Sequence, residues 1–208
     1  MAVRTWFLIG VRYLADLLDY RSPRVAAVAR PAWRKVSGAI GLDDYWSHRH
    51  HFQYYQEVLR LARAHVPAGR TVLDVGANDT RVLRRLDWFE RRVALDVNPM
   101  PSQRGIERVQ TDFLAYRADP PFDLVICLQV LEHLSDPATF ARKLLEVGRT
   151  VIVSVPYQWP TGLHPGHVQD PVSEAMLVGW VGRSPVETRI VRNGRDRLIA
   201  VFPGSELD

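Results

Sequence analysis

The sequence predicts an α/β fold: a doubly wound sheet of seven strands, mostly parallel, with a C-terminal antiparallel hairpin and an N-terminal helical extension. Between residues 71 and 182, short apolar runs alternate with segments of helical periodicity. Parallel neighbours need such crossovers to carry the chain back. The final runs, 187–192 and 197–202, are separated by "NGRD", and the Asn193–Gly194 pair suits a tight hairpin turn.

The elements follow from these patterns in chain order. An amphipathic helix is expected over 45–66, ended by "PAGR". The expected strands are "TVLDVG" (71–76), "RRVALDV" (91–97), "ERVQTD" (107–112), "FDLVICLQV" (122–130) and "RTVIVSVP" (149–156). Further helices are expected over 79–86, 136–147 and 171–182.

The first 45 residues differ from the rest and are expected to form a helical extension to a domain covering 46–208. Apolar residues from Trp6 to Leu18 fall near helical spacing, but Arg12 and Asp16 interrupt the run, which is unlike a signal peptide or a membrane span. Such a helix packs on the domain or on a second subunit, or it docks on a membrane surface or another partner. These alternatives stay open.

Composition narrows the class of protein. With 208 residues, 47% of them hydrophobic and 24% charged, the chain resembles an ordinary globular domain. The single cysteine, Cys127, excludes a disulfide framework within the chain and favours a reducing, cytoplasmic compartment. The net charge of +4 comes from scattered arginines rather than from the basic stripe typical of nucleic-acid binding.

Polar residues recur where the expected strands end: Asp74, Asp96, Asp112, and then Gln129, Glu132 and His133. A single acid there is usually a cap or a turn residue, but repetition at one sheet edge favours a ligand site. Asp96 follows the Gly76 turn by twenty residues, the spacing of an acid that binds ribose hydroxyls. The turn has one glycine, and Asp79 would repel a pyrophosphate, so a cationic ribose-bearing ligand fits better than a dinucleotide of the dehydrogenase type.

These motifs resemble a known family. "VLDVGANDT", "VALDVNP", "QTDF" and "FDLVICLQVLEHLSDPATFARKLLEVGRTVIVSVP" are similar to successive motifs of class I S-adenosylmethionine-dependent methyltransferases over residues 70–156, and the final hairpin suits their Rossmann-like fold. "VLEHLSDP" is especially like the small-molecule branch of methyltransferase types 11 and 23.

The resemblance implies a role for each matching position. Asp74 and the backbone of Gly76 would flank the cationic methionine part of S-adenosylmethionine, and Gln129 would line its methyl end. Asp96 would hold the ribose hydroxyls. Asp112 would accept a hydrogen bond from the adenine amino group, with Val97 and Phe113 covering the ring faces.

The loop departs from the family pattern, because Asn78 and Thr80 occupy positions often held by glycine. Asparagine tolerates a positive φ, so we expect Asn78 to make the turn. Thr80 is β-branched and resists such angles, but it can begin the next helix.

Three histidines are candidates for removing the acceptor's proton: His133, His164 and His167. His164 and His167 lie in a breaker-rich segment after the fifth parallel strand, which the fold would place over the methyl group, so we favour these two. His133 is expected to begin a helix and make a structural hydrogen bond. "HPGHVQD" and "SHRHH" lack the usual metal-ligand spacing, so we expect no metal.

The expected acceptor is a small molecule, a lipid or a sugar-containing metabolite, methylated at oxygen. The Asn/Asp-Pro-Pro-aromatic motif that goes with base methylation in this superfamily is replaced by "CLQVLEH", which disfavours nucleic acid. The alternative is a non-catalytic methyltransferase-like scaffold or membrane-associated binding protein, because the cofactor loop is poor in glycine.

Overall fold

The computed structural model describes residues 53–78, 80–192 and 195–204. The expected extension over 1–45, the start of the following helix, Asp79 and the Asn193–Gly194 pair lie outside the described residues. Among the residues that are described, no helix has the length and apolar character needed to cross a membrane.

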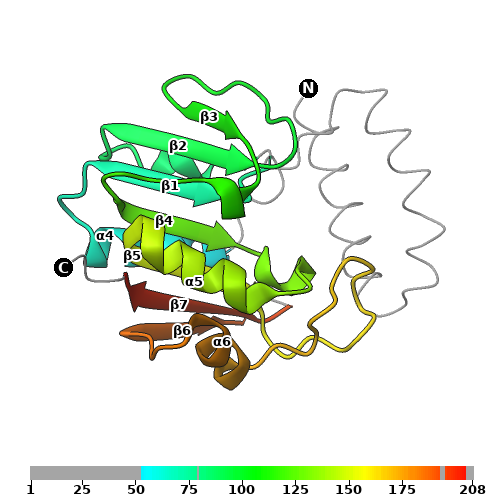
Figure 1. Cartoon of the computed structure of the whole chain (residues 1–208). Helices are drawn as coiled ribbons and strands as arrows, with labels where there is room; N and C mark the ends of the chain where they lie inside the picture. The colour runs from blue at the N-terminus through cyan, green and yellow to red at the C-terminus, as the bar shows by residue number, and fades with distance from the viewer. Residues whose placement is uncertain (1–52, 79, 193–194, 205–208) are drawn as a thin grey trace, which may run out of the picture. The chain divides into compact units, whose positions relative to one another are not determined.

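A single seven-stranded sheet organises the described part of the chain, in the order β3-β2-β1-β4-β5-β7-β6 (Figure 1). β1 to β5 are parallel, and β7 runs antiparallel to both β5 and β6, which confirms the predicted fold class. The strands are β1 Thr71–Val75, β2 Arg91–Asp96, β3 Glu107–Gln110, β4 Phe122–Leu128, β5 Gly148–Pro156, β6 Glu187–Val191 and β7 Arg197–Pro203.

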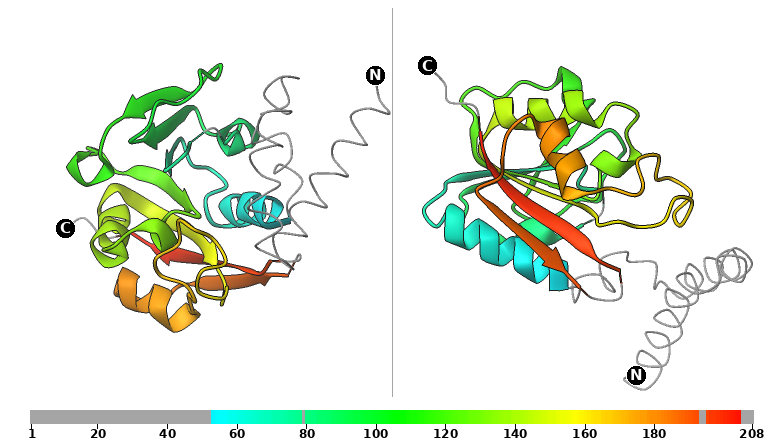
Figure 2. Two further views of the ribbon diagram at one scale, coloured as in Figure 1. Left: turned by 90° about the vertical axis from the view of Figure 1, so that its right-hand side faces the viewer. Right: turned by 90° about the horizontal axis from the view of Figure 1, so that it is seen from below.

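Helices cover the two faces of the sheet, as Figure 2 shows from below. On one face lies α4 (Gln53–His65), which turns Tyr54, Val58 and Leu61 into the core. On the other lie α5 (Pro137–Val147) and α6 (Glu174–Val181). Their starts are fixed by side-chain caps, because Asp136 accepts from Thr139 N and Ser173 accepts from Met176 N. α5 and α6 were predicted within a few residues, and the end of α4 within one residue.

One predicted helix is wrong. The described part of the predicted segment, 80–86, contains only a single 3-10 turn, η1 (Val82–Arg85). The physical reason is that Val82, Leu83 and Leu86 all reach the core from this one turn and the bend after it. A longer helix would bury no further apolar residue, and short helices are costly to nucleate.

Two other 3-10 turns follow strands at the carboxyl edge: η2 (Phe113–Ala115) and η3 (Leu131–His133). β3 ends at Gln110, two residues earlier than expected, because Asp112 leaves the sheet to cap η2 through Leu114 N. The hairpin pairs Val191 with Arg197, so its connection runs over 192–196.

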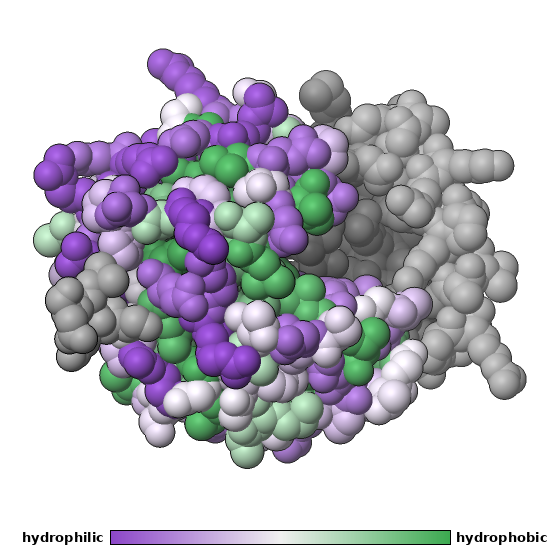
Figure 3. All heavy atoms as spheres, viewed as in Figure 1, coloured by the Kyte–Doolittle hydropathy of each residue, from purple (hydrophilic) through white to green (hydrophobic). Residues whose placement is uncertain are grey.

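The surface of the face in Figure 3 is mostly hydrophilic near the edge formed by β2 and β3, with apolar residues showing in smaller groups between. The exposed large apolar residues of the described chain are isolated along the sequence: Val97, Leu114, Val168 and Val186.

The strand order places a topological switch point beside β1. From β1 the chain crosses to β2 on one side, while β4 lies on the other. Ligands of doubly wound folds bind at the carboxyl ends of the strands that flank such a point. The residues just beyond Val75, Asp96 and Leu128 therefore form the candidate site.

Candidate active site

The loop after β1 makes its turn with two left-handed residues. Gly76 has φ +74° and Asn78 has φ +47°, so the asparagine takes the angle that the sequence required of it. A Cβ on Gly76 would lie 2.5 Å from Cγ2 of Val130, hence only glycine fits there. Thr80 does not have a positive φ, and its backbone N donates to the Ala77 carbonyl in a local turn.

Asp74 is the buried acid of this loop. Its side chain receives a 3.2 Å hydrogen bond from the Thr80 hydroxyl, and the residue is 2% exposed. Burial raises the pKa of Asp74 to about 7, and the nearby charge of Asp96 adds to this, whereas the Thr80 bond opposes it. An approaching cation would favour the ionised form.

Asp96 ends β2 and ties two loops together. Its Oδ2 accepts from Asn78 N at 2.9 Å, and its Oδ1 accepts from the backbone N of Asn98 at 2.8 Å and from its side-chain amide at 3.3 Å. A carboxylate offers about four lone-pair sites, so Oδ2 retains one acceptor site. The carboxylate therefore fixes the loop geometry and can still bind a hydroxyl.

The three residues predicted on the adenine side are placed differently from one another. Val97 is 65% exposed just past Asp96. Asp112 is exposed and its Oδ1 accepts from Leu114 N at 2.9 Å, which is the helix-cap role. Phe113 is buried and packs against Phe140 at 4.7 Å, so its ring belongs to the core rather than to an open surface.

Gln129 lies beyond β4 at φ +59°. Its backbone N donates to the Ser154 carbonyl at 2.8 Å, and its side-chain amide donates to the Ser154 hydroxyl at 3.2 Å. These bonds lock the carboxyl ends of β4 and β5 together. The structure thus brings Asp74, Gly76, Asn78, Asp96 and Gln129 to one edge of the sheet.

The three candidate histidines converge. His133, His164 and His167 each offer a ring nitrogen, and these atoms lie within 4.8 Å of one another. His133 Nδ1 donates to the Gly166 carbonyl at 2.8 Å, the structural bond that was expected, although His133 ends η3 rather than beginning a helix. His164 and His167 stack with ring centroids 4.4 Å apart.

Two buried carboxylates flank His167. Nδ1 of His167 donates to Oδ2 of Asp170 at 2.7 Å, while its Nε2 lies 4.0 Å from Oε1 of Glu132. Burial raises the pKa of Glu132 to about 8, and Asp170 adds to the rise. Burial also lowers the pKa of His167, although Asp170 opposes this. The sequence predicted no role for either acid, because Glu132 and Asp170 come near His167 only in the folded chain.

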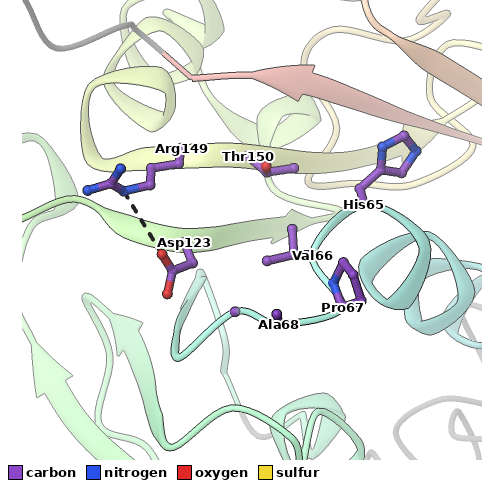
Figure 4. Close-up of a pocket in the computed structure, with 8 residues that line it drawn as sticks. His65, Val66, Pro67, Ala68, Asp123, Arg149 and Thr150 are labelled. Carbon is purple, nitrogen blue, oxygen red and sulfur yellow. Dashed lines mark ion pairs between the residues drawn. The ribbon is translucent and has the colours of Figure 1, made fainter.

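The cavity in Figure 4 lies at the opposite edge of the sheet and does not belong to this site. It has a volume of about 320 Å³ and is lined by the end of α4 and the first residues of β4 and β5. Its acid, Asp123, accepts hydrogen bonds from Arg70 N, Thr71 N and the Thr71 hydroxyl, which fasten β1 to β4. These contacts explain Asp123 as a structural residue.

Several solved structures share the fold. The chain is 18% identical to the N-methyltransferase NodS from Bradyrhizobium japonicum WM9 bound to S-adenosyl-L-homocysteine, with TM-score 0.63, covering 79% of this chain and 93% of that one. It is 19% identical to the 1,6-didemethyltoxoflavin-N1-methyltransferase of Burkholderia thailandensis, with TM-score 0.64 and coverage of 88% and 89%. Magnesium protoporphyrin IX methyltransferase from Synechocystis PCC 6803 is 17% identical, with TM-score 0.57 and coverage of 90% and 97%.

The comparison with curated protein sequences found no match. A family model described as a methyltransferase domain matches residues 45–176, more than half of the chain. That range contains the β1 loop, Asp96, Gln129 and all three histidines of the cluster. The chain therefore belongs to the methyltransferase domain family, and it is an S-adenosylmethionine-dependent methyltransferase.

Proposed function

We propose that this enzyme methylates a small organic acceptor, at oxygen, in a site at the carboxyl ends of β1, β2, β4 and β5. The observation that carries the proposal is the division of this edge into two parts. Asp74 and Asp96 surround a turn that only Gly76 can make, whereas the imidazoles of His133, His164 and His167 gather beyond β4 and β5. The first part suits the cofactor and the second suits the acceptor.

The residues around the Gly76 turn, the first of these two parts, fit S-adenosylmethionine. Asp74 is a buried carboxylate that an adjacent cation would stabilise, which suits the amino and sulfonium charges of the methionine part. The remaining acceptor site on Asp96 Oδ2 suits a ribose hydroxyl. Val97 offers an exposed apolar surface for adenine, Asp112 an acceptor for its amino group, and Gln129 a wall at the methyl end.

Phe113 contributes less directly than the sequence predicted. Because its ring is buried against Phe140, we propose that it supports the adenine pocket from inside the core. Its main role is then to hold η2, and with it Asp112, at the edge of the sheet.

The acceptor would lie under the segment that links β5 to α6, which carries His164 and His167. Trp159 is buried and stacks on His167 with ring centroids 5.5 Å apart, which holds the His167 ring in place behind the acceptor. Two of the solved neighbours named above are methyltransferases of a didemethyltoxoflavin and of a magnesium protoporphyrin, and this supports a small organic acceptor here. Lipid and sugar-containing acceptors remain within the same proposal.

S-adenosylmethionine supplies a methyl group that is already activated by its positively charged sulfur. The chain's own residues must hold the two reactants in register, and positioning can contribute roughly 7–11 kcal/mol in ideal cases. The hydrogen bond between Gln129 and Ser154 helps by holding the ends of β4 and β5 in fixed positions. An imidazole of the cluster accepts the proton of the acceptor hydroxyl, which must leave as the hydroxyl oxygen bonds to the methyl carbon.

The test is transfer of labelled methyl from S-adenosylmethionine to a small-molecule extract, followed by mass identification of the product. We expect a labelled organic product with a new O-methyl group, and less of it from the Asp96→Ala variant when the cofactor concentration is well below saturation. A product methylated at nitrogen would contradict the choice of oxygen. Cofactor binding without any labelled product across aqueous and lipid extracts would favour the non-catalytic scaffold instead.

A further inference from the structure

The sequence spacing of its histidines predicts no metal, but in the folded chain the histidine cluster has the composition of a metal centre. His133 comes from η3, while His164 and His167 come from the segment after β5, and their ring nitrogens lie within 4.8 Å of one another. Three imidazoles on one tetrahedral ion, with metal–nitrogen distances of about 2.0–2.1 Å, have nitrogens about 3.3 Å apart. To bind such an ion, the ring nitrogens must approach one another by up to about 1.5 Å, mostly by rotation of the rings.

The groups behind two of these rings match the usual surroundings of metal-binding histidines. Such histidines donate their second ring N–H to a carboxylate or to a backbone carbonyl, which fixes the tautomer and aims the other nitrogen at the ion. His167 donates through Nδ1 to Asp170, and His133 donates through Nδ1 to the Gly166 carbonyl. Nε2 of both rings is therefore the nitrogen with a lone pair.

The third ring needs a small adjustment. Nδ1 of His164 accepts a 3.3 Å hydrogen bond from the backbone N of Gly166, which places the proton of the neutral ring on Nε2. Turning the ring gives up this long bond and presents a lone pair to the ion. Gly166 permits the close approach, because a Cβ there would lie 3.2 Å from Nδ1 of His133.

Glu132 is the independent observation that points to a cation. Its side chain is fully buried, and neither carboxylate oxygen has a hydrogen-bond partner within the described residues. Oε1 lies 4.0 Å from Nε2 of His167, beside the cluster. A buried carboxylate without donors is costly, whereas one next to a divalent ion is stabilised.

We propose that His133, His164 and His167 bind a divalent transition-metal ion of the zinc type, with Glu132 balancing its charge. Three imidazoles and an open fourth position are the ligand set of catalytic zinc sites. His133 is exposed, which leaves the ion a route from solvent.

The position of the acceptor rests on the proposed function. At that position the metal ion adds a way to activate the acceptor. A metal ion lowers the pKa of a bound hydroxyl, so that the oxygen can lose its proton to solvent without a free imidazole base. The substrate class is then an acceptor with a metal-binding hydroxyl. Metal binding itself does not depend on that role.

The experiment uses the full chain, untagged and treated with chelator, in a background where His48, His50 and His51 are alanine. That background removes the other histidine-rich segment of the sequence. Co²⁺ is added as the probe, with Zn²⁺ competition measured by calorimetry. We expect one equivalent to bind and to give the intense visible absorption of a four-coordinate cobalt ion.

Two variants and one control test the assignment. We expect His164→Ala to weaken Co²⁺ binding by at least about tenfold, and Asp170→Asn, which removes the carboxylate behind His167, to weaken it about 10- to 100-fold. The matched control is His65→Ala, because His65 ends α4 and is paired with Glu187 of β6 rather than with the cluster. It should bind Co²⁺ like the parent protein.

An unaltered spectrum on adding Co²⁺ to the folded parent protein would overturn the proposal and leave the His167–Asp170 pair as a general base. Equal Co²⁺ affinity in His164→Ala would overturn it as well. S-adenosylmethionine binding, measured separately, distinguishes this failure from failure of the proposed function.

Discussion

Asp74 and Asp96 lie near the ends of neighbouring strands, yet their carboxylates are held in different ways. Asp96 receives hydrogen bonds from Asn78 N and from both nitrogens of Asn98, so it is anchored by donors. Asp74 receives only the Thr80 hydroxyl in the described structure and is almost fully buried. The first acid is thus suited to orientation, and the second is suited to sensing the charge of a ligand.

Replacing Asp96 tests the ribose assignment. Because hydrogen bonds to charged groups are worth about 1.5–3 kcal/mol, Asp96→Ala should weaken S-adenosylmethionine binding about 10- to 150-fold in a calorimetric titration. Asp87→Ala serves as the control, since Asp87 is an exposed acid shortly before β2 begins, whereas Asp96 ends that strand. Unchanged affinity in folded Asp96→Ala would show that the ribose lies elsewhere.

The raised pKa of Asp74 predicts a pH effect on binding. Since the pKa is about 7 without ligand, the fraction of ionised Asp74 rises steeply through that pH, and affinity for a cationic ligand should rise with it. Asp74→Asn should remove this part of the pH dependence. The titration of the ligand itself is common to both proteins and cancels in the ratio of their affinities. A pH-independent ratio between pH of about 6 and 8 would count against the role of Asp74.

The same acid affects stability with a definite sign. The folded pKa of about 7 exceeds the ordinary value of 3.8, so the folded protein binds more protons between these values. The Asp74 contribution to the free energy of unfolding therefore falls as pH rises from about 4 to about 7. Chemical denaturation of the parent and of Asp74→Asn at several pH values isolates this term, because the stability of the parent relative to that of the variant should fall as pH rises through this range.

At the scale of elements, the site depends on how the β1 loop packs on the chain beyond β4. Gly76 touches Val130, and the next residues along, from Leu131 to His133, form the turn that carries Glu132 and His133. The cofactor loop and the histidine cluster are therefore parts of one packed edge.

Gly76→Ala should strain this edge. The new Cβ would meet Val130 at 2.5 Å, and φ is +74°, so we expect destabilisation of about 2–4 kcal/mol from overpacking and backbone strain together. Gly162→Ala is a matched control, because Gly162 has φ +78° but nothing within 4 Å of a Cβ. Thermal unfolding should place it between the parent and Gly76→Ala. Adding Val130→Ala to Gly76→Ala should cost less stability than the two single changes added together, and strict additivity would refute the packing argument.

The elements also show what the sequence could predict. Periodicity and caps such as Asp136 and Ser173 mark α5 and α6, because these signals are local. The 79–86 helix fails because its apolar residues are buried by a single turn, which only tertiary packing decides. The convergence of His133 with the other two histidines could not be predicted either, since 33 residues separate His133 from its partner Gly166.

At the scale of the whole molecule, one rule explains why distant motifs meet. Parallel strands place their carboxyl ends on the same edge, and the order β3-β2-β1-β4-β5 puts the acids of β1 and β2 beside the residues that follow β4 and β5. The sequence was sufficient for this prediction because the strands, and the polar residues at their carboxyl ends, can be recognised in it. It was insufficient for side-chain direction, as buried Phe113 shows.

The most direct test of the account is calorimetric titration of S-adenosylmethionine into the full chain near neutral pH. The arrangement of Asp74, Gly76, Asn78 and Asp96 at one edge predicts binding of one equivalent, and predicts its loss by at least about tenfold in Asp96→Ala. The absence of binding to the folded parent protein at about millimolar cofactor, where even a weak complex would form, would contradict the central claim.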